Sequence, residues 1–329
     1  MPLTLLVPVY NDWPAVARLV EELERELRAH RRAASLLIVD DGSSTSPGAA
    51  LMTVHGGFTS FDILHLRTNL GHQRAIAVGL AYLEAERSPE AVVVMDGDGE
   101  DRPEDVEKLA QALERDGAAR IVFAERTRRS EGMTFAVLYW FYRVVHRALT
   151  GERVRVGNFC IIPAAQLRRL VAVSDLWNHF AAAVFHARIP FTTIPTVRGE
   201  RYAGKSQMNF VGLVTHGLSA MSVFGDRIGV RLLLLASAVT LAGLLTGSAI
   251  AIWHVASGAP LSMSPVYTVV PMVMLLLLAV ATSLAFVFII LAGRGNQGFL
   301  PFRQYRDYVD RITSVATHER YAQQPVPRN

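Results

Sequence analysis

The sequence predicts an α/β domain built on a mostly parallel sheet, followed by a hairpin of two helices that cross a membrane. Two observations lead to this prediction. The first 125 residues alternate short, continuous apolar runs with amphipathic stretches, which is the pattern of β-α-β units whose sheet is covered on both faces. Between Arg231 and Arg294 the chain contains no Asp, Glu, Lys or Arg, and such a long uncharged stretch is rare in soluble folds.

The β-α-β part has five predicted strands and three predicted helices. The strands are expected at residues 3–10, 35–41, 61–67, 91–96 and 119–125, and the helices at 13–30, 72–86 and 103–116. Asp12 and Asp101 each precede an early proline, as helix-capping residues do. This alternation predicts a Rossmann-like open sheet, whose ligands bind at the carboxyl ends of the strands.

The uncharged region contains two apolar segments, at residues 232–253 and 269–292. Each exceeds the roughly 20 residues that a helix needs to cross the hydrocarbon core, and a pair of buried core helices is the alternative. Basic residues flank the pair, and the connector contains none. The positive-inside rule then predicts a multi-pass protein of the inner (cytoplasmic) membrane with both termini in the cytoplasm. The flanking basic residues are Arg227, Arg231, Arg294, Arg303 and Arg306.

These features predict four regions. We expect an enzyme-sized cytoplasmic domain at 1–205, a juxtamembrane amphipathic segment at 206–230, the helical hairpin at 231–293, and a cytoplasmic tail at 294–329 that could reach a neighbouring subunit. The single cysteine, Cys160, excludes an internal disulfide. A formal charge of +4 with dispersed basic residues argues against a nucleic-acid partner.

The stretch "VVVMDGDGEDRPED", residues 92–105, holds six carboxylates within ten residues directly after an apolar run. Asp96 and Asp98 stand two apart, so in extended backbone both project to one side. Two hard oxygen ligands on one face suit Mg²⁺ or Mn²⁺, with diphosphate oxygens completing the shell. An EF-hand loop starting at Asp96 is excluded because Asp101 occupies the position that requires glycine. A solvated acidic turn remains the alternative.

Polar residues also follow the first two predicted strands, in "PVYND" (8–12) and "VDDGSS" (39–44). Ordinary turn chemistry is the alternative for the second. The sequence has no G-x-G-x-x-G after the first strand and no G-x-x-x-x-G-K-[ST]. A nicotinamide cofactor and a P-loop nucleotide are therefore disfavoured.

Five segments in order resemble the family 2 glycosyltransferases, and among them the polyprenyl-phosphate glycosyltransferases such as dolichyl-phosphate mannose synthase and its bacterial undecaprenyl-phosphate relatives. They are "LVPVYND", "IVDDGSS", "NLGHQRAIAVGL", "DGDGEDRPED" and "RGERYAGKSQMNF". The resemblance implies a GT-A fold, a Mg²⁺ or Mn²⁺ cofactor and inverting transfer of a sugar from a nucleotide-sugar, UDP-sugar favoured, to polyprenyl phosphate. It further implies contact with membrane lipids, a homo-oligomer such as a tetramer, and a product used in cell-envelope glycan or glycolipid modification.

The resemblance also assigns residues. Asp96 and Asp98 match the metal-binding carboxylates, with Asp96 also at the nucleotide-sugar, and Glu100 stands near the metal. The positions that hold the base and ribose of the donor are Pro8, Tyr10, Asp12, Asp40 and Asp41. The positions that match the acceptor-phosphate cluster are Arg198, Arg201, Lys205 and Ser206, and guanidinium groups bind phosphate oxygens in pairs. A juxtamembrane basic patch on anionic lipid headgroups is the alternative for this cluster.

One departure from the family pattern concerns catalysis. Relatives commonly read G-D-F-R where this chain reads "GNFC", so Asn158 replaces the proposed catalytic base and Cys160 the arginine. A lipid phosphate, with a second pKa near ~6, is already an anion at neutral pH and needs positioning rather than a base. An alcohol acceptor would need one, and Asp101 is the candidate. A non-catalytic nucleotide-sugar-binding partner is the alternative that Asn158 supports.

Other interpretations are weaker. A processive polysaccharide synthase is disfavoured because no Q-x-x-R-W motif is present. Residues 133–149 fit an interfacial helix, with a core helix as the alternative. His72 fits a helix start or a donor contact, and the other histidines have no metal-ligand spacing. Residues 177–179 are placed at the sugar pocket by position alone.

Overall fold

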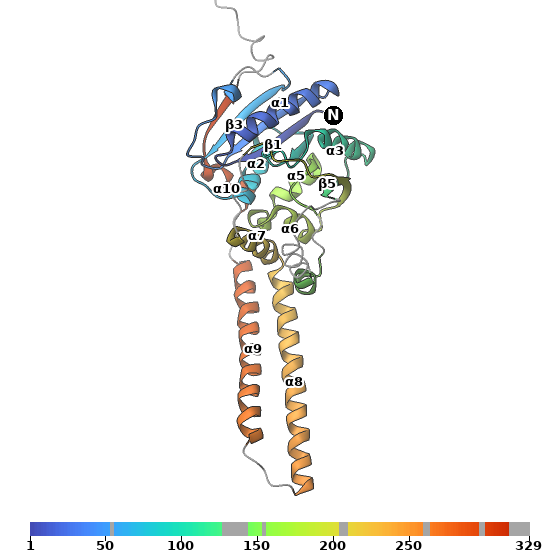
Figure 1. The fold of residues 1–329 in the computed structure, drawn as a ribbon, viewed down its shortest axis with the longest axis vertical. Coiled ribbons are helices and arrows are strands. Elements are labelled where there is room, and N and C mark those ends of the chain that lie inside the picture. The colour runs from blue at the N-terminus through green and yellow to red at the C-terminus, as the bar shows by residue number, and fades with distance from the viewer. Residues whose placement is uncertain are drawn as a thin grey trace, which may run out of the picture. The chain divides into compact units, whose positions relative to one another are not determined.

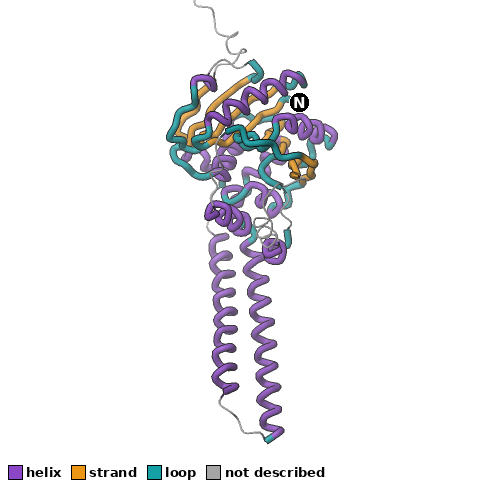
Figure 2. Tube along the Cα trace, in the orientation of Figure 1, coloured by secondary structure: helices purple, strands orange, loops and turns teal. Residues whose placement is uncertain are grey.

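The computed structural model describes residues 1–52, 56–126, 144–152, 156–203, 210–258, 264–295 and 300–315. The chain divides into two compact units. The first comprises Met1–Met133, Val154–Val223 and Phe299–Asn329, and the second comprises Thr134–Arg153 and Phe224–Gly298. In Figure 2 the strands gather in the first unit, whereas the described part of the second is helical.

The first unit is built on an eight-stranded sheet in the order β7-β5-β6-β4-β1-β2-β3-β8. The four consecutive strands β4, β1, β2 and β3 are parallel. Strands β6 and β8 run antiparallel to their neighbours. The strands are β1 (Leu3–Val9), β2 (Ala34–Asp40), β3 (Ser60–Leu66), β4 (Ala91–Val94), β5 (Ile121–Arg126), β6 (Cys160–Pro163), β7 (Phe191–Thr196) and β8 (Val309–Val315).

Helices cover both faces of this sheet (Figure 1). On one face, α1 (Trp13–Ala29) and α3 (Pro103–Arg115) pack on apolar side chains of β1, β2 and β4. On the other lie α2 (His72–Glu86), α5 (Ala164–Val171) and α6 (Phe180–His186). The amphipathic stripe of α1, with buried residues at Val16, Leu19, Val20, Leu23 and Leu27, has the spacing of a helix that buries one face.

Short and terminal elements complete the first unit. These are the 3₁₀ turns η1 (Ala49–Met52) and η2 (Ser174–Trp177), and the helices α7 (Phe210–Ser222) and α10 (Pro301–Tyr308). The residues expected as a cytoplasmic tail thus include α10 and the edge strand β8. Tyr308 O accepts a hydrogen bond from Arg67 N at 2.9 Å, which joins α10 to the end of β3.

The second unit contains two long apolar helices, α8 (Gly225–Ser257) and α9 (Ser264–Gly295). Gly229 lies against Val287, and Gly243 lies against Leu276, so the two helices run antiparallel and side by side (Figure 1). Gly225–Ser257 and Val269–Val287 are long and apolar enough to cross a membrane, and they indicate a membrane association. Of the expected interfacial helix, residues 144–150 are helical and residues 133–143 lie outside the described residues.

The predicted fold class is confirmed: a mostly parallel sheet with helices on both faces precedes two apolar helices. The two predicted side-chain caps are wrong. Asp12 stands at the N-cap of α1 but makes no capping hydrogen bond, and the N-cap of α3 is Arg102. Both carboxylates are used in the site described next.

Candidate functional site

The polar strand ends predicted from the sequence meet at one edge of the sheet. Residues 10–12 follow β1, Asp40 ends β2 and Asp41 follows it, and residues 96–101 follow β4. Because β1 pairs in parallel with both β2 and β4, their carboxyl ends lie at the same edge. The fold therefore brings the D-x-D segment together with the residues predicted to contact the donor, Pro8, Tyr10, Asp12, Asp40 and Asp41, which we call the donor-side residues.

The D-x-D loop is organised by its own carboxylates. Asp101 Oδ2 accepts the Asp96 N–H at 3.0 Å, and Asp98 Oδ1 accepts the Glu100 N–H at 2.9 Å. Gly99 has φ +88°, a conformation that favours glycine. Asp101, predicted as a base for an alcohol acceptor, is 3% exposed and also receives Arg126 Nη2 at 3.0 Å. Both of its oxygens are thus engaged in holding the loop.

Burial perturbs two of these carboxyl groups. Burial, followed by repulsion from Asp96, raises the pKa of Asp101 to about 7, although Arg126 opposes the shift. Burial, again followed by Asp96, also raises the pKa of Asp98 above its ordinary value. Crowded, buried carboxylates of this kind favour a bound cation.

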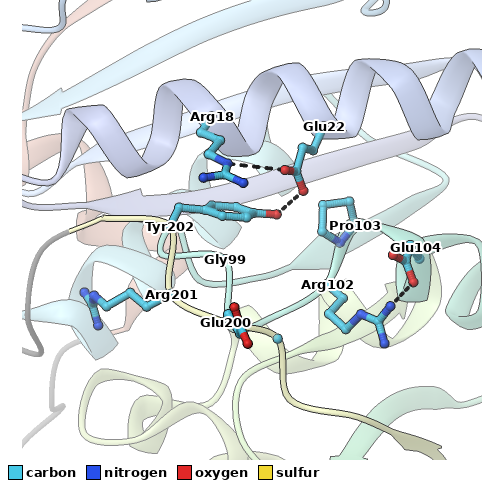
Figure 3. A pocket seen from close by; sticks show the side chains of 10 residues that line it. Arg18, Glu22, Gly99, Arg102, Pro103, Glu104, Glu200, Arg201 and Tyr202 are labelled. Atoms are coloured by element: carbon cyan, nitrogen blue, oxygen red, sulfur yellow. Dashed lines mark hydrogen bonds and ion pairs between the residues drawn. The ribbon is translucent and has the colours of Figure 1, made fainter.

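A segment that we call the strap, residues 198–203, crosses the D-x-D loop. Gly199 N donates to Glu100 O at 2.8 Å, and Tyr202 N donates to Asp98 O at 2.9 Å. The Tyr202 hydroxyl donates to Glu22 on α1, and the Arg18 guanidinium lies 4.8 Å from the ring centre. Figure 3 shows the Tyr202 ring against these two side chains. A cavity of about 200 Å³ lies beside the strap, between α1 and the start of α3.

The two strap arginines predicted to bind the acceptor phosphate are paired with carboxylates. Arg201 Nη1 donates to Asp98 Oδ2 and Nη2 donates to Asp12 Oδ2, each at 3.1 Å. Arg198 holds Glu100 through two hydrogen bonds of 2.9 and 2.7 Å. In Figure 3 the Arg201 side chain projects away from the Tyr202 ring. Lys205 and Ser206 lie outside the described residues.

The donor-side residues differ in their exposure to solvent and in their hydrogen bonds. Tyr10 is 45% exposed at the end of β1, whereas Pro8 is buried within it. Asp41 accepts the backbone N–H groups of Leu70 at 2.7 Å and Gly71 at 2.9 Å, just before α2. Its burial raises its pKa to about 6. Asp40 is also buried and pairs with His65 at 2.8 Å.

Asn158 belongs to a chain of amide hydrogen bonds. The Phe180 N–H donates to Gln73 Oε1 at 2.7 Å, Gln73 Nε2 donates to Asn158 Oδ1 at 3.1 Å, and Asn158 Nδ2 lies 2.9 Å from His72 Nε2. Because the backbone N–H can only donate, it fixes the orientation of both amides. Asn158 therefore donates to His72, and His72 Nε2 is an acceptor.

This arrangement leaves a carboxylate oxygen without a donor. His72 Nε2 lies 3.2 Å from Asp96 Oδ1, but with Nε2 acting as an acceptor the two atoms cannot share a hydrogen bond. No described residue donates to this buried oxygen. A buried acceptor without a donor is costly, and a cation at Asp96 and Asp98 would satisfy it. The D-x-D residues therefore fit a divalent metal.

The described residues include no cluster of three or more His, Cys, Asp and Glu side chains placed to hold a metal. The two aspartates would need oxygens from the ligand to complete a coordination shell. Glu100, predicted near the metal, is instead turned to Arg198 and lies 3.6 Å from Arg126. Hard cations that keep few protein ligands are common at phosphate sites.

Sequence reasoning missed Arg126 and Gln73 and did not settle His72. Arg126 ends β5, and only the fold brings it to Asp101. The sequence signal for His72 and Gln73 was their place at the start of a helix in a family-like segment. Of the residues placed at the sugar pocket by position, Trp177 stacks 5.1 Å from the Arg74 guanidinium, and His179 caps α6 by accepting the Ala182 N–H.

Comparisons with known proteins identify the family to which the chain belongs. Residues 4–177 match the family described as "Glycosyl transferase family 2". An uncharacterized glycosyltransferase of Bacillus subtilis, YkcC, is 23% identical over 68% of each chain. The undecaprenyl-phosphate 4-deoxy-4-formamido-L-arabinose transferase of Salmonella choleraesuis is 24% identical over 64% of each chain, so this chain spans less than two thirds of that relative's length.

Among solved structures, glucosyl-3-phosphoglycerate synthase from Mycobacterium tuberculosis, in complex with Mn²⁺, UDP-glucose and phosphoglyceric acid, is similar with a TM-score of 0.49. It is 15% identical, and the match covers 69% of this chain and 80% of that one. The family match covers more than half of the 329 residues and includes the first four polar segments of the site. The chain therefore belongs to glycosyl transferase family 2 and is a glycosyltransferase.

Proposed function

We propose that this glycosyltransferase moves a sugar from a nucleotide-sugar, UDP-sugar favoured, to a polyprenyl phosphate with inversion at the anomeric carbon. The observation that supports this most directly is Arg201, which joins the D-x-D carboxylate Asp98 to the donor-side carboxylate Asp12. One guanidinium thus lies where donor diphosphate and acceptor phosphate would meet. A relative that carries undecaprenyl phosphate in its name supports the acceptor class.

Asp96 and Asp98 are the residues that would hold Mg²⁺ or Mn²⁺. When bound, the metal supplies charge neutralisation for the departing nucleoside diphosphate. Asp101 supports the backbone of Asp96 by accepting its N–H, and Arg126 holds Asp101 through an ion pair of 3.0 Å. The Asp41 loop presents the start of α2 to the donor, since both of its carboxylate oxygens bind backbone N–H groups there.

The acceptor would be held by the strap. Arg198 and Arg201 are paired with Glu100 and Asp98, so an incoming phosphate would replace carboxylates as the partner of guanidinium groups that are already in position. The phosphate oxygen then attacks the anomeric carbon, the bond to the nucleoside diphosphate breaks, and no proton has to be removed from a dianionic nucleophile. Lys205 and Ser206 would add to this cluster.

We also propose that α8 and α9 cross the membrane as a hairpin with both termini in the cytoplasm. The basic residues around the hairpin support this orientation. Two of them are also structural within the second unit. Arg227 pairs with Glu152 at 2.9 Å, and Arg231 donates to Ala148 O at 2.8 Å, so residues 148–152 are fixed to the start of α8.

The test uses the full-length protein in detergent with undecaprenyl phosphate, Mn²⁺ or Mg²⁺, and radiolabelled UDP- and GDP-sugars. We expect label in the organic phase with one donor, its loss with EDTA, and its recovery with added metal. Asp98→Ala should abolish transfer, whereas Asp116→Ala, which removes a surface ion pair with Arg120, should retain it. Metal-dependent nucleotide binding without transfer to lipid would instead support a non-catalytic partner or another acceptor.

A further inference from the structure

The edge strand β8 is connected to the donor side of the site by side-chain hydrogen bonds. Thr313 Oγ1 lies 3.0 Å from His65 Nε2, and His65 Nδ1 lies 2.8 Å from Asp40 Oδ2. Thr313 and His65 are 248 residues apart in the sequence, with both apolar helices between them. The three side chains span the adjacent strands β8, β3 and β2.

The lowered pKa of Asp40 determines how this carboxylate pairs with His65. Burial would raise its pKa, but hydrogen bonds from His65 and then Ser43 outweigh burial and lower it. Asp40 is therefore an anion that accepts the His65 Nδ1–H. The other ring nitrogen, Nε2, shares a hydrogen bond with the Thr313 hydroxyl, in which either group can be the donor. The bond between His65 and Thr313 exists only while β8 is paired with β3.

The connection continues from Asp40 to the ends of two strands. Asp40 Oδ1 accepts the Ser43 N–H at 3.0 Å, and Ser43 Oγ accepts the Asn11 N–H at 2.9 Å. Asn11 has φ +54°, a left-handed conformation in which Asn is enriched among the non-glycine residues. Asn11 lies between Tyr10 and Asp12, and Asp40 precedes Asp41. The donor-side residues of β1 and β2 are thus held by one run of hydrogen bonds.

We propose that Thr313 is a positioning residue for nucleotide-sugar binding, acting through His65 and Asp40 on the strand ends that hold the donor. This inference rests on the proposed function. It assigns Asp40 a supporting role rather than a direct contact with the donor, because both of its oxygens are occupied by protein groups. It also makes the donor site depend on a strand that is synthesised after both apolar helices.

The neighbouring residue on β8 offers a matched control. Ser314 Oγ donates to Asp62 Oδ1 at 2.6 Å, so it makes a side-chain bond to the same strand, β3, three residues before His65. Asp62 is also held by Arg87 at 2.9 Å and lies away from the carboxyl end of the strand. Substituting Thr313 or Ser314 should not detach β8, since the backbone pairs from Phe61–Val315 to Leu66–Val309 remain.

The experiment compares Thr313→Val, Thr313→Ser and Ser314→Ala in the full-length protein in detergent. The readouts are UDP and GDP dissociation constants with Mn²⁺ by calorimetry, and the unfolding temperature. Thr313→Val removes one hydroxyl hydrogen bond and should weaken nucleotide binding by about 3- to 10-fold. Thr313→Ser should restore it. Ser314→Ala should lower the unfolding temperature about as much as Thr313→Val does. It should leave nucleotide binding unchanged.

Two results would overturn the inference in different ways. If Thr313→Val and Ser314→Ala lower the unfolding temperature alike and neither changes nucleotide affinity, β8 has only a structural role and the proposed function stands. If the unmodified protein binds neither UDP nor GDP, the proposed function falls together with this inference. A loss of affinity that Thr313→Ser does not restore would also contradict the assignment, because the hydroxyl is what the geometry uses.

Discussion

Replacing Arg201 by alanine should strengthen metal binding and abolish sugar transfer. Arg201 donates to Asp98 Oδ2 at 3.1 Å, so a metal that binds Asp98 has to displace this hydrogen bond. Both side chains are less than a quarter exposed, at 23% and 18%. A hydrogen bond to a charged group contributes about 1.5–3 kcal/mol, and the long distance favours the lower value. Removing the competitor should therefore tighten Mn²⁺ binding about tenfold.

The strap should keep its place in this variant. Its backbone bonds to Glu100 and Asp98, and the Tyr202 bond to Glu22, do not involve the guanidinium. Free Mn²⁺ is measured from its electron paramagnetic resonance signal during titration of the detergent-solubilised protein, without a donor. Transfer is measured separately with the labelled nucleotide-sugar of the proposed reaction, and it should be lost because the proposed acceptor phosphate would have no guanidinium at Asp98.

Arg198→Ala is the matched control for charge. It removes the same charge from the same strap, but its partner is Glu100. If Asp98 is the metal ligand, Arg198→Ala should change Mn²⁺ affinity less than threefold, which is below about 0.7 kcal/mol. Equal tightening in both variants would show a general charge effect or a metal held by Glu100. Unchanged or weaker Mn²⁺ binding in Arg201→Ala would refute the competition itself.

Three further predictions concern the groups that shape the site. Burial raises the pKa of Asp41 from 3.8 to about 6, so its stability contribution is complete below pH 3.8 and is lost as pH rises through 6. Relative to Asp41→Asn, the free energy of unfolding of the unmodified protein should thus rise by up to about 3 kcal/mol as the pH falls from 7 to 4. A difference in unfolding temperature that does not depend on pH would contradict this. Gly99→Ala places a Cβ against the Tyr202 ring at a positive φ and should destabilise the protein by about 1–3 kcal/mol. When the substitution is made in a Tyr202→Ala background, thermal unfolding should show a smaller loss of stability. An equal loss would exclude the clash with the ring. Gln73→Leu leaves the buried Phe180 N–H without its acceptor and should cost about 1–3 kcal/mol, whereas Gln73→Glu keeps an acceptor and should cost less in the same unfolding measurement.

The first five strands and three helices are predicted closely because each is specified by local sequence. Continuous apolar runs such as residues 36–39 are completely buried in β2, and the apolar stripe of α1 has a clear helical period. Strand β8 escapes this reasoning. It is an edge strand with mostly exposed residues, so it lacks an apolar face, and it follows a long apolar region that separates it from its partner β3.

Part of the candidate site can be proposed from the sequence. Short motifs single out Asp96, Asp98 and Arg201 as candidates, since their spacing and charge are visible in one segment each, and the structure places Arg201 in contact with Asp98. The capping role of Asp12 was wrong because a local pattern could not show that Arg201 lies opposite it. The amide chain from Phe180 to His72 joins positions on three separate segments, and only the folded sheet brings them within hydrogen-bonding distance.

The position of Asn158 favours an acceptor that needs no base. A general base must first reach the proton it removes, and its pKa matters only after that. Asp101 has a pKa near 7, but it is buried and both of its oxygens are occupied. His72 Nε2 receives the Asn158 amide, and that amide cannot itself accept a proton. An alcohol would therefore find no base in Asp101, His72 or Asn158, whereas the proposed phosphate acceptor would need none.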